Sequence, residues 1–178
     1  MQIFKIRPYT GVLAVLLVIS LVLFNFTYVK ESRVSNLHVQ EVYDKLAINS
    51  GQQDVPPLII INADVINAWT DGETVTVTTG ILKIFENDDQ MALVMAHEIA
   101  HAINHDVMHD DIDQATVEAH ADKLGAFIMM RAGFDICKGK EIFSVFKNLF
   151  GDTSKAEDHP SNSYRIDQLN LPQCSIFN

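Results

Sequence analysis

The stretch that decides the fold runs from residue 87 to residue 104 and reads Asn-Asp-Asp-Gln-Met-Ala-Leu-Val-Met-Ala-His-Glu-Ile-Ala-His-Ala-Ile-Asn. It contains neither glycine nor proline, and its apolar residues recur at the spacing of a helix. The stretch therefore predicts one long helix. Asp88 or Asp89, which follow Asn87, are expected to cap its first turn.

Three residues of this helix form the pattern His-Glu-x-x-His, namely His97, Glu98 and His101. Residues four apart lie on one side of a helix, so both imidazoles can bind the same ion, for zinc at about 2.0 to 2.1 Å. Glu98 would lie beside the ion and act as general base towards a water molecule that the zinc makes acidic. The pattern predicts one zinc ion per chain, bound next to its own base.

A third ligand is expected on a second helix, in the segment from about 113 to 133, where apolar residues again recur at helical spacing. Glu118 and Asp122 are four residues apart and share one face of it. We expect Glu118 to complete a two-His, one-Glu set and Asp122 to accept the outer N–H of a zinc His. Small residues at 121 and 125 would let the two helices approach closely. The alternative is an exposed acidic helix face.

Four sequence blocks occur in order between residues 58 and 170. They are Asn67-Ala68-Trp69 with Gly72 and residues 74–82, then His97 to His101, then Glu118-x-x-x-Asp122, and finally His159-Pro160 with Arg165-Ile166. Their order and spacing resemble the HtpX-like family of gluzincin zinc metallopeptidases, which is related to the CaaX prenyl proteases. Two positions depart from the family pattern: Trp69 stands where Phe is usual, and Tyr164 where an acidic residue is common.

The resemblance implies a role for each matching residue. His97, His101 and Glu118 would bind zinc, Glu98 would be the catalytic base and acid, and Asp122 would support a ligand. His159 and Arg165 would lie near the site as catalytic residues, one of them stabilising the developing oxyanion. The alternatives for these two are a loop histidine before proline and an ordinary surface arginine.

Residues 74–79 alternate valine with threonine, which predicts a strand with one apolar and one polar face. In zincins an extended peptide adds to a strand beside the metal, and such backbone pairing accepts many sequences. We therefore expect the substrate to lie beside this strand. The residues expected to contact it are Asn67, Ala68, Val75, Thr76 and Val77. The alternative is a half-buried strand with no role in binding.

Residues 11–29 are nineteen uncharged residues, about 28 Å long as a helix and close to the roughly 30 Å hydrocarbon core of a bilayer. They predict an uncleaved transmembrane anchor. Lys5 and Arg7 precede this segment, which favours a cytoplasmic amino terminus and an extracytoplasmic, periplasmic catalytic domain. The alternative is a cleaved signal peptide and a secreted protein.

The sequence thus predicts an anchor over residues 1–30 and one zinc metallopeptidase domain over residues 31–178. The expected fold is an α+β minimal zincin, mainly helical with a small sheet, preceded by the transmembrane helix. Residues 30–178 hold 11 basic and 23 acidic residues, a net charge of −12, which argues against a nucleic-acid partner. The expected strands are at 58–62 and 74–79, and further helices at 33–48, 137–149 and 161–169.

The predicted function is that of a membrane-anchored zinc endopeptidase that cleaves unfolded or membrane-associated polypeptides. A zinc-stabilised module that holds unfolded chains at a membrane without cutting them is the alternative, although such a module has no need of Glu98. The two cysteines, Cys137 and Cys174, either form a disulfide in an oxidising compartment or remain as buried thiols.

Overall fold

The computed structural model describes residues 36–104, 113–152 and 160–175. The chain divides into two compact units, Met1–Val39 and Gln40–Asn178. A helix over residues 36–49 begins the described part. From Gln40 onwards all of the described elements belong to the second unit, which contains the candidate site.

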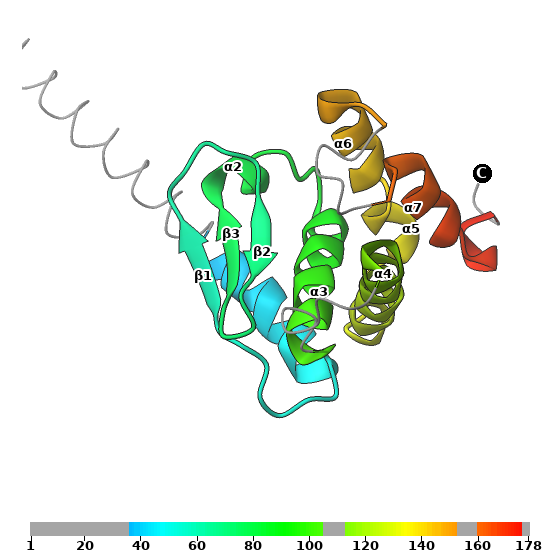
Figure 1. Cartoon of the computed structure of the whole chain (residues 1–178). Coiled ribbons are helices and arrows are strands. Elements are labelled where there is room, and N and C mark those ends of the chain that lie inside the picture. Colours follow the sequence, from blue (N-terminus) through cyan, green and yellow to red (C-terminus); the bar gives the residue numbers. More distant parts are fainter. Residues whose placement is uncertain (1–35, 105–112, 153–159, 176–178) are drawn as a thin grey trace, which may run out of the picture. The chain divides into compact units, whose positions relative to one another are not determined.

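The second unit is mainly helical with one small sheet, so the expected α+β class is confirmed (Figure 1). Its elements after the first helix are β1 (Leu58–Ile61), β2 (Ala68–Thr70), β3 (Val75–Thr78), α2 (Thr79–Leu82), α3 (Asp88–Asn104), α4 (Gln114–Arg131), α5 (Ile136–Gly139), α6 (Ile142–Phe150), α7 (Asn162–Gln168) and the 3₁₀ helix η2 (Pro172–Ser175).

The sheet has the order β1-β3-β2, with β1 parallel and β2 antiparallel to β3. The strands expected at 58–62 and 74–79 are present as β1 and β3, but β2 was not predicted, because three residues are too short to show an alternating pattern. Asp71 forms the turn between β2 and β3: its side chain accepts hydrogen bonds from the N–H groups of Glu73 and Thr74 at 2.9 and 2.7 Å. Figure 1 shows β2 on the side of the sheet nearest to α3.

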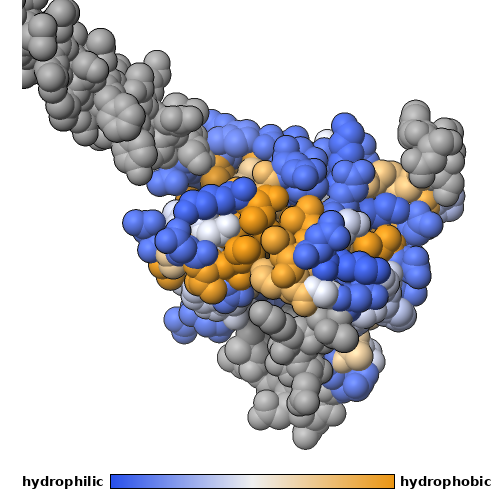
Figure 2. Space-filling model, turned by 90° about the horizontal axis from the view of Figure 1, so that it is seen from above, coloured by the Kyte–Doolittle hydropathy of each residue, from blue (hydrophilic) through white to orange (hydrophobic). Residues whose placement is uncertain are grey.

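The outer face of the sheet is apolar and partly exposed. Ile59 and Trp69 flank Thr76 in one cross-strand row, and Ile61 lies in the next. Ile59, Ile61 and Trp69 are 42, 40 and 37% exposed, whereas Thr76, between Ile59 and Trp69, is buried. Figure 2 shows apolar residues gathered in the middle of the face that is seen from above. Val65, whose carbonyl lies close to Gly80 of α2, is also exposed. This apolar surface adjoins β2.

The two long helices, α3 and α4, pack closely against each other, as expected from the small residues of α4. A Cβ atom added at Gly125 would lie 2.9 Å from the backbone nitrogen of His97, so only glycine allows this approach. The cap of α3 differs from the prediction: Asn87 Oδ1 accepts the N–H of Gln90 at 3.0 Å, and the helix begins with Asp88. Asp89 instead accepts the N–H of Asp135 at 2.7 Å.

The carboxy-terminal helices agree with the prediction in part. The single helix expected at 137–149 is two helices, α5 and α6, with a break at Lys140 and Glu141. The backbone of Gly139 lies against the carbonyl of Asp89, which fixes α5 on the start of α3. Helix α7 lies within the expected range of 161–169. The open question about the cysteines has an answer: Cys137 in α5 is bonded to Cys174 in η2.

The predicted localisation, a single-pass membrane anchor with an extracytoplasmic domain, is corrected by the structure. Among residues 36–104, 113–152 and 160–175, no helix is both long enough and apolar enough to cross a membrane. The long helices α3 and α4 carry ionisable residues along their length and pack within the domain. The segment 11–29, on which the prediction rested, lies outside the described residues.

Candidate metal centre

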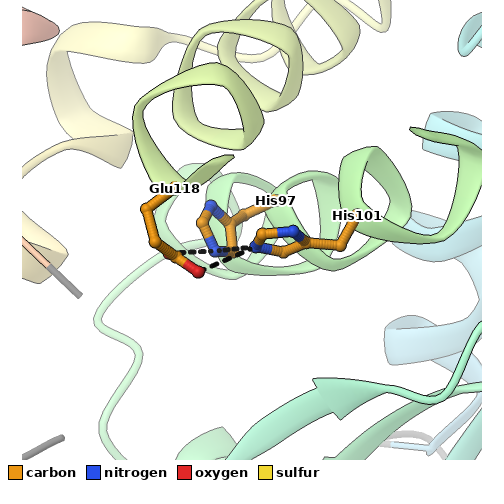
Figure 3. Close-up of side chains that lie close together, drawn as sticks. All are labelled: His97, His101 and Glu118. Carbon is orange, nitrogen blue, oxygen red and sulfur yellow. Dashed lines mark hydrogen bonds and ion pairs between the residues drawn. The ribbon is translucent and has the colours of Figure 1, made fainter. Parts of the chain in front are cut away.

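Three side chains from two helices converge on one point (Figure 3). His97 and His101 lie one turn apart on α3, and Glu118 approaches from α4. The Nε2 atoms of the two imidazoles are 3.0 Å apart. Glu118 Oε2 lies 3.3 Å from His97 Nε2, and its Oε1 lies 3.3 Å from His101 Nε2. Each side chain thus offers one ligand atom to the same small space.

The donor set and its spacing fit a zinc ion. With ligand atoms about 2.0 to 2.1 Å from a tetrahedral ion, neighbouring ligand atoms lie about 3.3 to 3.4 Å apart. The two Nε2 atoms are 3.0 Å apart, and each lies 3.3 Å from its nearer Glu118 oxygen, distances close to this edge length. With a single oxygen of Glu118 as the ligand, all three ligand atoms lie within 4.8 Å of one another. Two imidazoles and one carboxylate also match the ligand types of catalytic zinc sites, which leave the fourth position open. The three residues can therefore hold such an ion.

The close approach of α3 and α4 is what buries these ligands. His97, His101 and Glu118 are 5, 8 and 2% exposed. A buried carboxylate is costly unless it has a partner, and Glu118 meets both imidazoles and the side-chain amide of Gln114 at 3.4 Å. At the other end of the pair, the side chains of Asn104 and His120 meet at 3.2 Å. Gln114 thus supports Glu118 from within α4, and the contact between Asn104 and His120 joins α4 to the end of α3.

Asp122 lies one turn after Glu118 and meets the opposite side of the His97 ring. Its Oδ1 is 3.0 Å from His97 Nδ1, so it can accept the proton there and leave Nε2 facing Glu118. Burial disfavours the charged imidazole. The hydrogen bonds to Asp122 and Glu118 outweigh burial, however, and raise the pKa of His97 from 6.5 to about 9 in the metal-free site.

Arg165 reaches this cluster from α7. Its Nε donates to Asp122 Oδ2 at 2.8 Å and its Nη2 to Oδ1, while Nη2 lies 3.3 Å from His97 Nδ1. Burial alone would raise the pKa of Asp122, but the hydrogen bonds from His97 and Arg165 lower it from 3.8 to about 2. Arg165 is thus near the site as expected, although its guanidinium is bound behind His97 and not on the side of the ligand atoms.

Phe143 is a residue of this environment that the sequence did not reveal. Its ring, on α6, lies under the Arg165 guanidinium with 4.2 Å between Cζ and the ring centroid. Phe143 is almost completely buried. The apolar pattern of residues 142–150 could indicate burial, but nothing local indicates an arginine partner 22 positions away.

The remaining predicted site residues lie in different places. Glu98 is partly buried on α3, next to His97. Asn67 and Ala68 lie at the start of β2, on the side of the sheet that borders α3. His159 lies outside the described residues.

The expected docking strand requires a correction. Val75, Thr76 and Val77 form β3, which is the central strand and is paired with β1 on one side and β2 on the other. All three residues are buried. The backbone of β3 is occupied on both sides, so no peptide can add to it. Sequence alternation identified the strand but could not show its neighbours.

Part of the chain matches a protein-family model. Residues 33–117, just under half of the 178-residue chain, match the model of peptidase family M48. The match includes the His-Glu-x-x-His pattern and ends one residue before Glu118. No curated protein matches the chain. Over this part the chain is similar to the M48 family of metal-dependent peptidases, and the match does not extend to the HtpX-like subtype.

Proposed function

Because the chain is similar to the M48 metallopeptidases, we propose that it is a zinc-dependent endopeptidase with His97, His101 and Glu118 as its ligands. The observation that carries the proposal is the convergence of these three side chains where α3 packs on α4, with one ligand atom of each residue within 4.8 Å of the others. The family match covers both histidines but not Glu118, so the role of Glu118 rests on this geometry.

The proposed reaction is hydrolysis of a peptide bond without a covalent intermediate. Zinc bound to such a set supplies acidity to water near neutral pH and polarises a carbonyl group. Glu98, adjacent to His97, takes the proton of the attacking water and later gives it to the leaving amine. Asp122 keeps the proton of His97 on Nδ1, so that Nε2 remains a ligand.

We propose β2, and not β3, as the strand to which the substrate adds. Hydrogen-bonded pairs alternate along an antiparallel ladder. Thr78 N donates to Asn67 O at 3.1 Å, and Asp71 N donates to Thr74 O at 3.4 Å. Trp69, halfway between these pairs, therefore directs its N–H and C=O towards β3. By the same alternation, Ala68 and Thr70 direct theirs away from β3, towards the edge of β2 that faces α3. No strand among the described residues pairs with this edge, so an extended peptide can accept and donate hydrogen bonds there.

Unfolded polypeptide is the proposed class of substrate. Only an extended segment can pair with a strand edge, and a folded protein rarely presents one. Trp69 lies on β2 itself, and Ile59 and Ile61 lie on the same face of the sheet, on β1 beyond β3. These partly exposed side chains suit the apolar side chains that unfolding exposes.

The replacement Glu98→Gln tests the proposal. It should leave zinc content unchanged and lower the rate of casein cleavage by at least about a hundredfold, since general acid–base catalysis contributes about 10² to 10⁴. Wild-type protein treated with a chelator should lose activity and regain it when zinc is returned. Asp167→Asn, an exposed carboxylate on α7, is the matched control and should cleave normally.

Two results would contradict the proposal. Cleavage at the wild-type rate by Glu98→Gln would remove Glu98 as the base. Chelator-sensitive binding of unfolded casein without any fragments would show that the site supports binding and not hydrolysis.

A further inference from the structure

Arg165 is the residue through which the carboxy-terminal part of the chain reaches the candidate metal ligands. It is 9% exposed, and both nitrogens that face Asp122 are bonded to its carboxylate. The face of the guanidinium lies on Phe143. A two-point ion pair of this kind fixes the orientation of a carboxylate. The position of Arg165 therefore determines how Asp122 meets His97.

Helix α7, which carries Arg165, has limited attachment to the helices that carry the ligands. Its main packing partner is α6, and its contacts with α3 and α4 are fewer. After the helix, Leu169 is buried, and Lys140 Nζ donates to Asn170 Oδ1 at 2.8 Å between exposed groups. The further polar contacts of α7 run to α6 and the two residues after it: Lys147 Nζ donates to Ser163 Oγ at 2.8 Å, Ser163 N to Asp152 Oδ1 at 2.9 Å, and Asn162 Nδ2 to Gly151 O at 3.2 Å. None of these contacts joins α7 to α3 or α4.

The disulfide supplies a covalent attachment at this point. It joins Cys174, in η2 directly after α7, to Cys137 in α5. Helix α5 is itself fixed to α3, because Asp89 accepts the N–H of Asp135 at 2.7 Å and the backbone of Gly139 lies against the carbonyl of Asp89. The segment that carries Arg165 is thus tied to the helix that carries His97 and His101.

We propose that the Cys137–Cys174 disulfide is a redox-sensitive clamp that keeps Arg165 on Asp122 and thereby sets the affinity of the site for zinc. This inference rests on the proposed zinc site. Reduction breaks the Sγ–Sγ bond with two electrons and two protons and leaves two thiols. A dithiol can supply both and is itself oxidised to a disulfide. In the reduced protein α7 is held by its noncovalent contacts with α6 and the residues after it, without a covalent tie to α5, and Asp122 loses its fixed orientation.

The test is the zinc dissociation constant of the full chain, measured by competition with a chromogenic chelator before and after reduction. A trialkylphosphine serves as the reductant, because it becomes the phosphine oxide with an oxygen from water and leaves no dithiol to bind zinc. Loss of a residue that supports a metal ligand weakens affinity about 10- to 100-fold. Reduction should raise the dissociation constant by that factor, and reoxidation should restore it.

Two variants test whether reduction changes the zinc affinity through Arg165. In Arg165→Gln the affinity should already be weakened by a similar factor, and reduction should then change it less than about twofold, since both changes remove the same interaction. The double variant Cys137→Ser, Cys174→Ser should equal the reduced wild type, which excludes zinc binding by free thiols. Asp167→Asn on α7 is the control and should respond to reduction as the wild type does.

The outcomes separate this inference from the proposed function. Tight zinc binding that is insensitive to reduction overturns the clamp alone. If reduction weakens zinc affinity equally in the wild type and in Arg165→Gln, the effect does not pass through Arg165. The same conclusion follows if circular dichroism shows the reduced wild type to be unfolded at the assay temperature. An oxidised protein that binds no zinc overturns the proposed function and the clamp with it.

Discussion

His97 and Asp122 show how single residues of this protein are tuned by their neighbours. The same contact raises the pKa of His97 to about 9 and lowers the pKa of Asp122 to about 2. For each residue the partner outweighs a burial effect of opposite sign. Both groups therefore favour their charged forms in the metal-free protein, and an ion that binds His97 must displace a proton.

These pKa values predict how the stability of the metal-free protein depends on pH. Asp122 has a lowered pKa, so its contribution is present above its ordinary value of 3.8 and is lost as pH falls through about 2. His97 has a raised pKa, so its contribution is present below 6.5 and is lost as pH rises through about 9. The contribution of the pair should thus be largest between about pH 4 and 6.5.

Urea midpoints of chelator-treated protein from pH 4 to pH 9.5 measure this dependence. Asp122→Asn should show a smaller decline on the alkaline side, since its amide cannot stabilise the imidazolium by charge. Identical profiles for the variant and the wild type would contradict the assigned pair. Lys123→Gln, an exposed change on the same helix, should follow the wild-type profile.

At the scale of elements, the contact between α3 and α4 depends on the absence of a side chain at Gly125. An added Cβ would lie 2.9 to 3.0 Å from backbone atoms of Ala96 and His97, which cannot move aside as a side chain could. Alanine favours a helix over glycine by about 1 kcal/mol. Overpacking costs about 1 to 3 kcal/mol and should outweigh that gain here.

Gly125→Ala is therefore expected to lower the unfolding free energy and to weaken zinc binding, because α4 must move away from α3 and take Glu118 with it. Denaturant midpoints and chelator competition measure the two effects. Lys123→Ala, on the exposed side of α4, should change neither. A more stable Gly125→Ala protein with unchanged zinc affinity would mean that the helices are not in this close contact.

The β2 strand gives a second prediction at this scale. A peptide on its free edge would place alternate side chains on the face that carries Trp69, while its backbone pairs with Ala68 and Thr70. Trp69→Ala should raise KM for apolar peptides several-fold and leave kcat within about twofold, because it removes contacts with side chains away from the reacting bond. Steady-state kinetics on matched apolar and polar peptides checks this. Equal effects on both peptides, or a loss confined to kcat, would argue against it.

At the scale of the whole molecule, metal binding and folding should be linked, because the three ligands belong to two helices that form only part of one core. A ligand that binds only the folded state stabilises it by about 2.7 kcal/mol at a hundred times its dissociation constant. Zinc should therefore raise the melting temperature of the full chain, and a chelator should lower it.

Glu118→Ala should remove most of this gain, since two imidazoles alone hold zinc weakly, whereas Asp167→Asn should keep it. Melting curves with increasing free zinc give the measurement. An equal rise in Glu118→Ala and wild type would show that zinc binds elsewhere. The carboxylate of Glu118 would then not be a ligand.

The sequence by itself determined the features that depend on local periodicity. The helix that carries His97 and His101, the face shared by Glu118 and Asp122, and the strand Val75–Thr78 all follow from spacings of two to four residues. The close approach at Gly125 was also foreseeable, because a small residue near the Glu118 face permits it. Local spacing predicts such features because it fixes the direction of neighbouring side chains.

Only the tertiary structure decided which elements lie next to each other. The central position of β3, the short strand β2, the break between α5 and α6, and the pairing of Cys137 with Cys174 all involve contacts between distant parts of the chain. The place of Arg165, behind His97 and on Phe143, is of the same kind. Such contacts depend on how whole elements pack, and residue spacing along the chain carries little information about that.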